Sequence, residues 1–176
     1  MKYLSKLSLI ITAAVLLSCG DNKKENEEQI IIGEQETTQS TTTTSTPEVS
    51  DGEVIEVSLT GNDQMQFNKN EIRVKAGQTV RLTFAHVGQM AKNVMGHNFV
   101  LLTQGTDINE FGNAAVQAAD NDYIPQNTNN VIANTKMIGG GETVTIEFEA
   151  PAAGTYDFIC SFPGHYAIMR GKFIVE

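Results

Sequence analysis

The residues with the clearest capacity for chemistry lie in a short stretch near the C-terminus. Cys160 is followed by His165 five positions later, and Met169 follows four positions after that. A thiolate, an imidazole and a thioether are soft or borderline ligands, which suit copper, above all Cu(I), better than magnesium or calcium. Two histidines, one cysteine and a weak axial methionine form the blue-copper arrangement. The chain has two further histidines, His86 and His97, either of which could supply the second imidazole.

The N-terminus has the pattern of a bacterial lipoprotein signal peptide. Lys2 and Lys6 precede an apolar run over 7–17, which is too short for a membrane-spanning helix and typical of a secretory signal. The run ends in Leu-Leu-Ser-Cys at 16–19, which resembles a lipobox. We therefore expect residues 1–18 to be removed and Cys19 to carry lipid, which predicts a protein of the bacterial cell envelope, facing the periplasm or the surface and anchored to a membrane. The alternative is an ordinary signal peptide with an incidental cysteine.

Residues 19–53 are expected to form a flexible, Thr-rich tether, because a polar segment of this kind cannot bury enough apolar area to offset its ordering entropy. Lipid on Cys19 would leave Cys160 without a disulfide partner. An unpaired thiol in an oxidising compartment requires an explanation, and metal binding supplies one. A disulfide between the two cysteines is the alternative.

From residue 54 onward the pattern changes to alternating apolar and polar residues, which predicts half-buried strands over 55–59, 72–74, 80–84 and 144–148. Many short strands separated by turns favour a β-sandwich over 54–176. One stretch differs: Asp107, with Glu110 three positions later, is typical of a helix start. This region has eight basic and twelve acidic side chains. It lacks the basic surface of a nucleic-acid-binding protein, so we expect no nucleic-acid partner.

Three motifs together resemble those of the azurins, the blue-copper proteins of the cupredoxin family. They are Cys-Ser-Phe-Pro-Gly-His-x-x-x-Met at 160–169, Gly-Asn-Asp-Gln-Met-Gln-Phe-Asn at 61–68, and Lys-Asn-Val-Met-Gly-His-Asn at 92–98. The resemblance implies an all-β, Greek-key, cupredoxin-like sandwich with one short inserted helix. The sequence departs from the family pattern in two places. Residues 54–176 hold no cysteine pair for the usual disulfide, and Phe99 stands where azurins have tryptophan.

The same resemblance implies a set of ligands and supporting groups. It implies that His97 supplies the second imidazole and binds the copper together with Cys160, His165 and Met169. The carbonyl of Gly96 would make a weak additional contact with the metal. By resemblance, Asn98 braces the two ligand loops, and the N–H groups of Asn98 and Phe162 point at the cysteine sulfur.

His86 is expected to pack near the metal without binding it. An apolar patch around His165 is expected to dock redox proteins such as cytochromes, and consists of Met65, Met95, Phe162, Pro163 and Ile168.

The function implied is one-electron transfer by a single copper ion cycling between Cu(II) and Cu(I), without conversion of a substrate, so no enzyme activity is expected. Copper binding and delivery in the periplasm is an alternative that would use the same ligands with faster metal exchange. A second alternative is an enzyme with a Cys–His pair as nucleophile and base, although no orienting acid is apparent and Met169 would have no role. A zinc ion can also bind cysteine and histidine.

Overall fold

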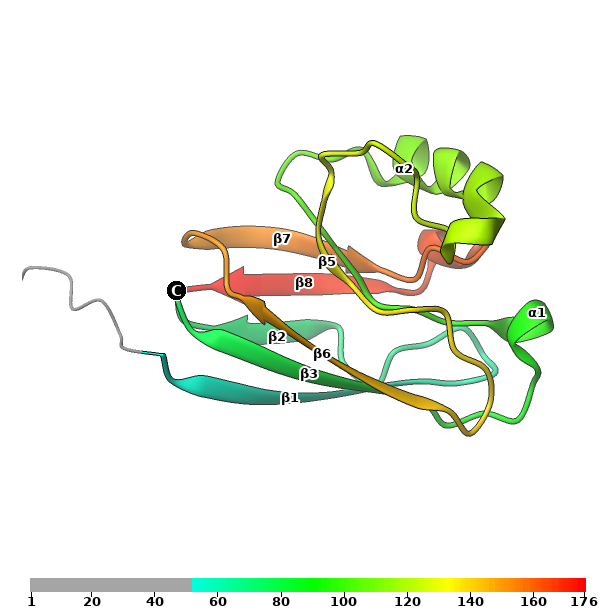
Figure 1. Ribbon diagram of the computed structural model, residues 1–176, viewed down its shortest axis with the longest axis horizontal. Helices are drawn as coiled ribbons and strands as arrows, with labels where there is room; N and C mark the ends of the chain where they lie inside the picture. The colour runs from blue at the N-terminus through cyan, green and yellow to red at the C-terminus, as the bar shows by residue number, and fades with distance from the viewer. Residues whose placement is uncertain (1–51) are drawn as a thin grey trace, which may run out of the picture. The chain divides into compact units, whose positions relative to one another are not determined.

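Alternating apolar and polar residues build two β-sheets in the computed structural model, which describes residues 52–176 (Figure 1). The smaller sheet has the order β1-β3-β6, formed by β1 (Val54–Gly61), β3 (Thr79–His86) and β6 (Thr143–Glu149). The larger sheet has the order β2-β8-β7-β4-β5, formed by β2 (Glu71–Val74), β8 (Arg170–Val175), β7 (Gly154–Ile159), β4 (Val100–Leu102) and β5 (Val131–Asn134). The predicted signal peptide, Cys19 and most of the tether lie outside the described residues.

Strand β3 shows why the sequence folds this way. Its alternate side chains Val80, Leu82 and Phe84 are all 0% exposed, whereas Arg81 and Thr83 between them remain partly exposed. Each buried apolar side chain of this size stabilises the fold by about 1.5–3 kcal/mol relative to an exposed one. The core that β3 covers includes aromatic rings of both sheets, namely Phe84, Phe99, Phe158 and Phe173. This core holds the two sheets face to face.

Strand pairing brings distant parts of the chain together at one end of the sandwich. β1 runs parallel to β3, with Gly61 opposite His86, and β2 runs parallel to β8. β7 and β8 form an antiparallel pair whose connection contains the short 3-10 helix η2 (His165–Ala167). The connections after β1, β3 and β7 therefore meet at the same end, while β1 begins and the chain ends at the other (Figure 1).

The predicted helix is present as α2 (Ile108–Ala115), which continues into the 3-10 helix η1 (Val116–Asn121). Asp107 caps it, because its Oδ1 accepts hydrogen bonds from the backbone N–H groups of Asn109 (2.8 Å) and Glu110 (3.0 Å). The buried face of α2 presents Phe111 and Ala115 to a second apolar cluster, which includes Val100, Leu102 and Ile159. The insertion is thereby packed on β4 and β7.

Two elements were not expected from the sequence. α1 (Lys92–Met95) is a helix of 4 residues with no buried side chain, and the half-buried edge strand β5 pairs with β4. Within residues 52–176, no helix combines the length and apolarity that crossing a membrane requires.

Candidate metal centre

Four elements of the chain deliver the candidate ligands to one end of the sandwich. Cys160 directly follows β7, His165 begins η2, and Met169 directly precedes β8. His97 lies between α1 and β4, on a different loop, and its backbone exchanges two hydrogen bonds with Ile138 (3.0 and 2.9 Å). The rigid hairpin of β7 and β8 and the β4 connection therefore fix both loops.

The side chains of three of these residues converge. The sulfur of Cys160 lies 3.7 Å from Nδ1 of His97 and 3.5 Å from Nδ1 of His165, and the two Nδ1 atoms lie 3.2 Å apart. All three ligand atoms lie within 4.8 Å of one another. Cys160 and His97 are 0% exposed and His165 is 3% exposed. The cluster is therefore a buried group of donors rather than a chance grouping on the surface.

The His97 ring is held in one orientation and one tautomer. Its Nε2 lies 2.8 Å from the carbonyl oxygen of Asn62, and a carbonyl can only accept, so Nε2 carries the proton. Nδ1 then presents a lone pair toward Cys160 and His165. Partners that fix the second ring nitrogen in this way are a general feature of metal-binding histidines.

Asn98 ties the two ligand loops together. Its Nδ2 donates to Oγ of Ser161 (2.8 Å), and its Oδ1 accepts from the Ser161 backbone N–H (2.9 Å). Nδ2 also donates to the carbonyl of Asp122 (3.0 Å), which attaches the end of the α2 insertion. Asn98 and Ser161 are both 0% exposed, so these hydrogen bonds form away from competing water.

The remaining predicted contacts, Met169 and the Gly96 carbonyl, lie beside this group. Met169 is 0% exposed, its N–H donates to the His165 carbonyl (2.7 Å), and its own carbonyl accepts from the Cys160 N–H (3.0 Å). The Gly96 carbonyl oxygen lies 3.9 Å from the Cys160 sulfur. Both residues are thus placed at the cluster, and their roles as ligands remain predictions.

Burial keeps the donors uncharged when no cation is bound. It raises the pKa of the Cys160 thiol to about 12, against an opposing effect of hydrogen bonds from the N–H groups of Asn98 and Phe162. Burial, with the neighbouring His97 and His86 rings, lowers the pKa of His165 to about 4. The pKa of His97 is also lowered, chiefly by burial. A thiolate is therefore held here only if a cation compensates the cost of its burial.

His86 lies beside the cluster without joining it. Its ring stacks on His97 with centroids 4.4 Å apart. Nε2 lies 2.8 Å from the Met95 carbonyl oxygen, and Nδ1 accepts the N–H of Gly88 (3.0 Å). Both ring nitrogens are thus engaged by the backbone, and His86 acts as a packed support for His97.

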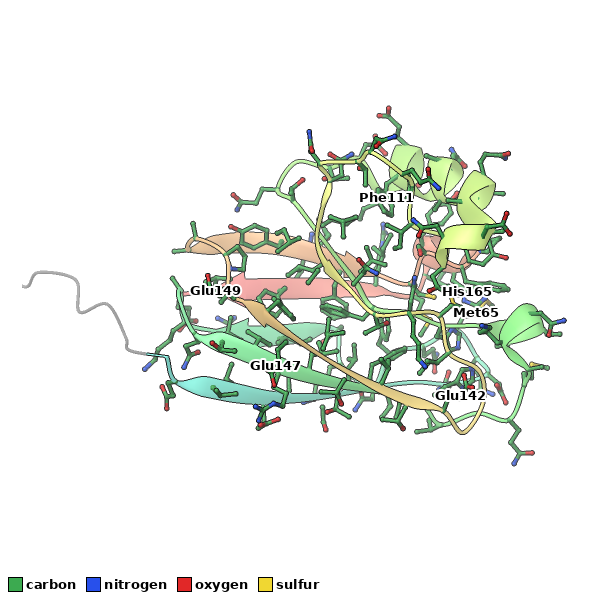
Figure 2. All side chains as sticks on the ribbon, in the orientation of Figure 1. Met65, Phe111, Glu142, Glu147, Glu149 and His165 are labelled. Carbon is green, nitrogen blue, oxygen red and sulfur yellow. The ribbon has the colours of Figure 1, made fainter. Side chains whose placement is uncertain are left out.

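Apolar side chains surround the His165 edge of the site. Phe162 contacts the imidazole with ring centroids 4.7 Å apart, and Met65 lies with His165 at the end of the domain away from Glu149 (Figure 2). Of the expected patch, Met65, Met95, Phe162 and Pro163 are half-buried and Ile168 is 62% exposed. Met90 (44%), before α1, and Val94 (58%), in α1, are further exposed apolar side chains, and the sequence analysis did not include them. Helix α1 lies at the end of the domain opposite the start of β1 (Figure 1).

The donor set fits copper. A buried sulfur and two inward-facing imidazole nitrogens, with a thioether beside them, are the ligands of a blue-copper site and not those of magnesium or calcium. Comparison with known proteins decides the family: the profile described as "Copper binding proteins, plastocyanin/azurin family" matches residues 53–176. The chain belongs to this family.

Individual relatives agree with this family assignment. Azurin-1 of Alcaligenes xylosoxydans xylosoxydans is 44% identical over 119 residues, which cover 65% of this chain and 92% of the relative. Outer membrane protein H.8 of Neisseria gonorrhoeae is 42% identical over 118 residues, 65% of this chain and 64% of that protein. The structure of auracyanin A, described as a "blue" copper protein from Chloroflexus aurantiacus, matches with a TM-score of 0.65 and 35% identity over 70% of this chain and 99% of that chain. The predicted cupredoxin fold, copper cofactor and azurin-like character are confirmed.

Proposed function

We propose that this domain carries single electrons on one copper ion held by His97, Cys160, His165 and Met169, with the Gly96 carbonyl as a weak contact. The observation that carries the proposal is the convergence of three buried donor atoms within 4.8 Å. Bound copper supplies a one-electron couple between Cu(II) and Cu(I), and its potential depends on the weak axial ligand and on hydrogen bonding at the sulfur.

The chain supplies a frame that keeps the ligands in one arrangement. Asn98 and Ser161 link the two loops through hydrogen bonds of 2.8 and 2.9 Å, and Asn62 holds the His97 ring at 2.8 Å. A site fixed this closely by its surroundings changes little when an electron arrives or leaves. Little reorganisation is the property that a rapid electron carrier needs.

Electrons enter and leave at His165, because it is the least buried of the three clustered donors and contacts Phe162. The apolar patch around it provides a docking surface for redox proteins such as cytochromes. Exposed apolar patches mark such surfaces, and small interfaces suit redox partners that must separate quickly. Nucleic acid is not among the expected partners, because residues 54–176 carry a net negative charge.

The domain is proposed to be a carrier and not an enzyme. A Cys–His enzyme needs an accessible thiolate, but Cys160 is 0% exposed and burial raises its pKa to about 12. The same burial of the donors favours slow metal exchange, which distinguishes an electron carrier from a copper-delivery protein.

We further propose that lipid on Cys19 anchors the protein to a membrane of the bacterial envelope. Support comes from the Leu-Leu-Ser-Cys sequence at 16–19 and from the similarity to a protein named outer membrane protein H.8. Strand β1 begins at the end of the domain opposite His165 (Figures 1 and 2). An anchor upstream of β1 therefore leaves the redox end free to meet partners.

A matched pair of cysteine variants tests the proposal. Voltammetry of the copper-loaded full chain is expected to give a reversible one-electron wave that Cys160→Ser abolishes and Cys19→Ser preserves. Cys19→Ser is expected instead to release the protein from the membrane fraction. A reversible wave that survives Cys160→Ser would refute the ligand assignment, and rapid loss of copper to a chelator from the unmodified protein would favour delivery.

A further inference from the structure

The backbone conformation of Gly61, the last residue of β1, does not require glycine. Its φ is not among the positive values that favour glycine in this structure. It pairs with His86 in the register of β1 and β3, and its carbonyl accepts the N–H of Val87 (2.8 Å). Any residue can adopt this extended backbone, so the reason for glycine must be space.

The space beside Gly61 is filled by the candidate copper site. A Cβ at this position would lie 2.8 Å from Cε of Met169, 3.0 Å from Cδ2 of His97 and 3.2 Å from Cζ of Phe84. All three side chains are 0% exposed, so none can move into solvent. The absent side chain is therefore what allows the thioether and the imidazole to approach the end of β1 together.

The side chains around Gly61 differ in how readily they can move. The His97 ring is held by the Asn62 carbonyl (2.8 Å) and by stacking on His86 (4.4 Å). The Met169 methyl is the end of a flexible side chain. Rotation about the Cγ–Sδ bond moves the methyl and turns the sulfur lone pairs, and rotation about the inner side-chain bonds moves the sulfur as well. An added methyl at position 61 would therefore displace chiefly the Met169 thioether.

We infer that Gly61 is a positioning residue that sets the placement of the Met169 thioether and limits that of the His97 imidazole. The inference rests on the proposed function. Because the potential of a blue-copper site is tuned by its axial ligand, filling the space at Gly61 changes the potential although no ligand residue is replaced, no charge is changed and the Asn62 hydrogen bond is kept. Gly61 acts only through Met169 and His97 and does not touch the ion.

The test is Gly61→Ala in the full chain, with two readouts. The first is the reduction potential of the copper-loaded protein. The second is the methyl resonance of Met169 in the metal-free protein labelled with [methyl-13C]methionine, which reports the thioether without any copper. Ala150→Val is the matched control, since it adds bulk to a buried position (7% exposed) directly after Glu149, at the end away from His165 (Figure 2).

We expect Gly61→Ala to shift the potential several-fold more than Ala150→Val does and to move the Met169 resonance, which Ala150→Val leaves in place. Adding Phe84→Leu to Gly61→Ala should return both readouts toward those of Phe84→Leu alone. Phe84 is the third side chain that a Cβ at position 61 would meet, so a smaller residue there opens space for the added methyl. If Gly61→Ala alone does not fold, recovery of folding in the double variant supports the inference, and a double variant that also fails to fold while Phe84→Leu alone folds overturns it.

An unchanged Met169 resonance in folded Gly61→Ala would overturn the inference, and so would a moved resonance with an unchanged potential in that single variant. Failure of the unmodified protein to give a copper redox wave would instead refute the proposed function, and the metal-free resonance would still decide whether Gly61 positions the thioether.

Discussion

The ring of Tyr166, the residue after His165, packs against Gly112 of α2 so closely that a Cβ at position 112 would lie 2.5 Å from two ring carbons. Its hydroxyl donates to Oδ1 of Asn113 (3.1 Å). The inserted helix is thereby attached to the loop that carries His165. A glycine that weakens the helix in isolation is thus required by the contact between the helix and this loop.

Replacing Gly112 with alanine is therefore expected to destabilise the protein, although alanine favours the helix by about 1 kcal/mol. Overpacking against the ring costs about 1–3 kcal/mol, so we expect the free energy of unfolding to fall by roughly 1 kcal/mol. Unfolding by denaturant measures this change in the free energy of unfolding. In a double variant with Tyr166→Ala the same alanine should become neutral or stabilising, and a loss of equal size in both backgrounds would rule out the contact as the cause.

Removal of the bridge between the ligand loops is a second test. Asn98→Ala deletes the buried hydrogen bonds to Ser161 and leaves the backbone N–H of Ser161 without a partner. We therefore expect the free energy of unfolding to fall by about 2–3 kcal/mol. Copper should also dissociate faster. Asn134→Ala is the control, because the Asn134 side chain donates one longer bond, 3.3 Å, to Thr135. Equal effects of the two substitutions would exclude a bridging role for Asn98.

The metal-free protein is expected to lose stability between about pH 6.5 and pH 4. The pKa of His165 falls from 6.5 to about 4 on folding, so the unfolded chain binds this proton first as the pH decreases, and the folded state loses roughly 1–3 kcal/mol across the window. Unfolding curves collected through this range measure the loss. His165→Asn should flatten the profile, and an unchanged slope in that variant would assign the pH dependence to other groups.

Copper binding is expected to release protons at neutral pH. The thiol of Cys160, with its pKa raised to about 12, is protonated in the metal-free protein and must ionise to bind copper. Calorimetric titrations in buffers of different ionisation enthalpy should therefore report about one proton released per ion. Cys160→Ser should abolish this release, and an unmodified protein that binds copper without releasing a proton would contradict thiolate ligation.

The docking patch can be tested without altering the site. Ile168→Lys places a charge on a side chain that is 62% exposed beside His165, so we expect slower electron exchange with a cytochrome and an almost unchanged potential. Val54→Lys, at a 42% exposed position where β1 begins, is the control. Equal slowing by both variants would indicate a general charge effect, and no slowing by Ile168→Lys would place docking elsewhere.

Sequence reasoning was strongest where one local pattern decides the structure. The period-two alternation predicted β3 because Val80, Leu82 and Phe84 face one core, and Asp107 marked the start of α2 through its own cap. The edge strand β5 was missed because its residues, half-buried with Asn134 exposed, show no alternation. Short edge strands depend on a neighbour, here β4, for their formation.

The candidate metal centre likewise contains residues that the local sequence predicted and residues whose roles depend on distant parts of the chain. The spacing of Cys160, His165 and Met169 predicted one loop of donors, and resemblance selected His97 over His86; the structure places His97 in the cluster and His86 behind it. The roles of Gly61 and Gly112 depend on which side chains approach from other strands and loops, and nothing in the local sequence reports that. The proposed lipid on Cys19 lies outside the described residues and remains a prediction.

The most direct test of the central claim is the visible and EPR spectrum of the full-length protein loaded with one equivalent of Cu(II). Ligation by the Cys160 thiolate with His97 and His165 predicts intense visible absorption and the narrow copper hyperfine splitting of a blue-copper site. A nearly colourless protein, with the EPR signal of a tetragonal site of nitrogen and oxygen ligands, would contradict it.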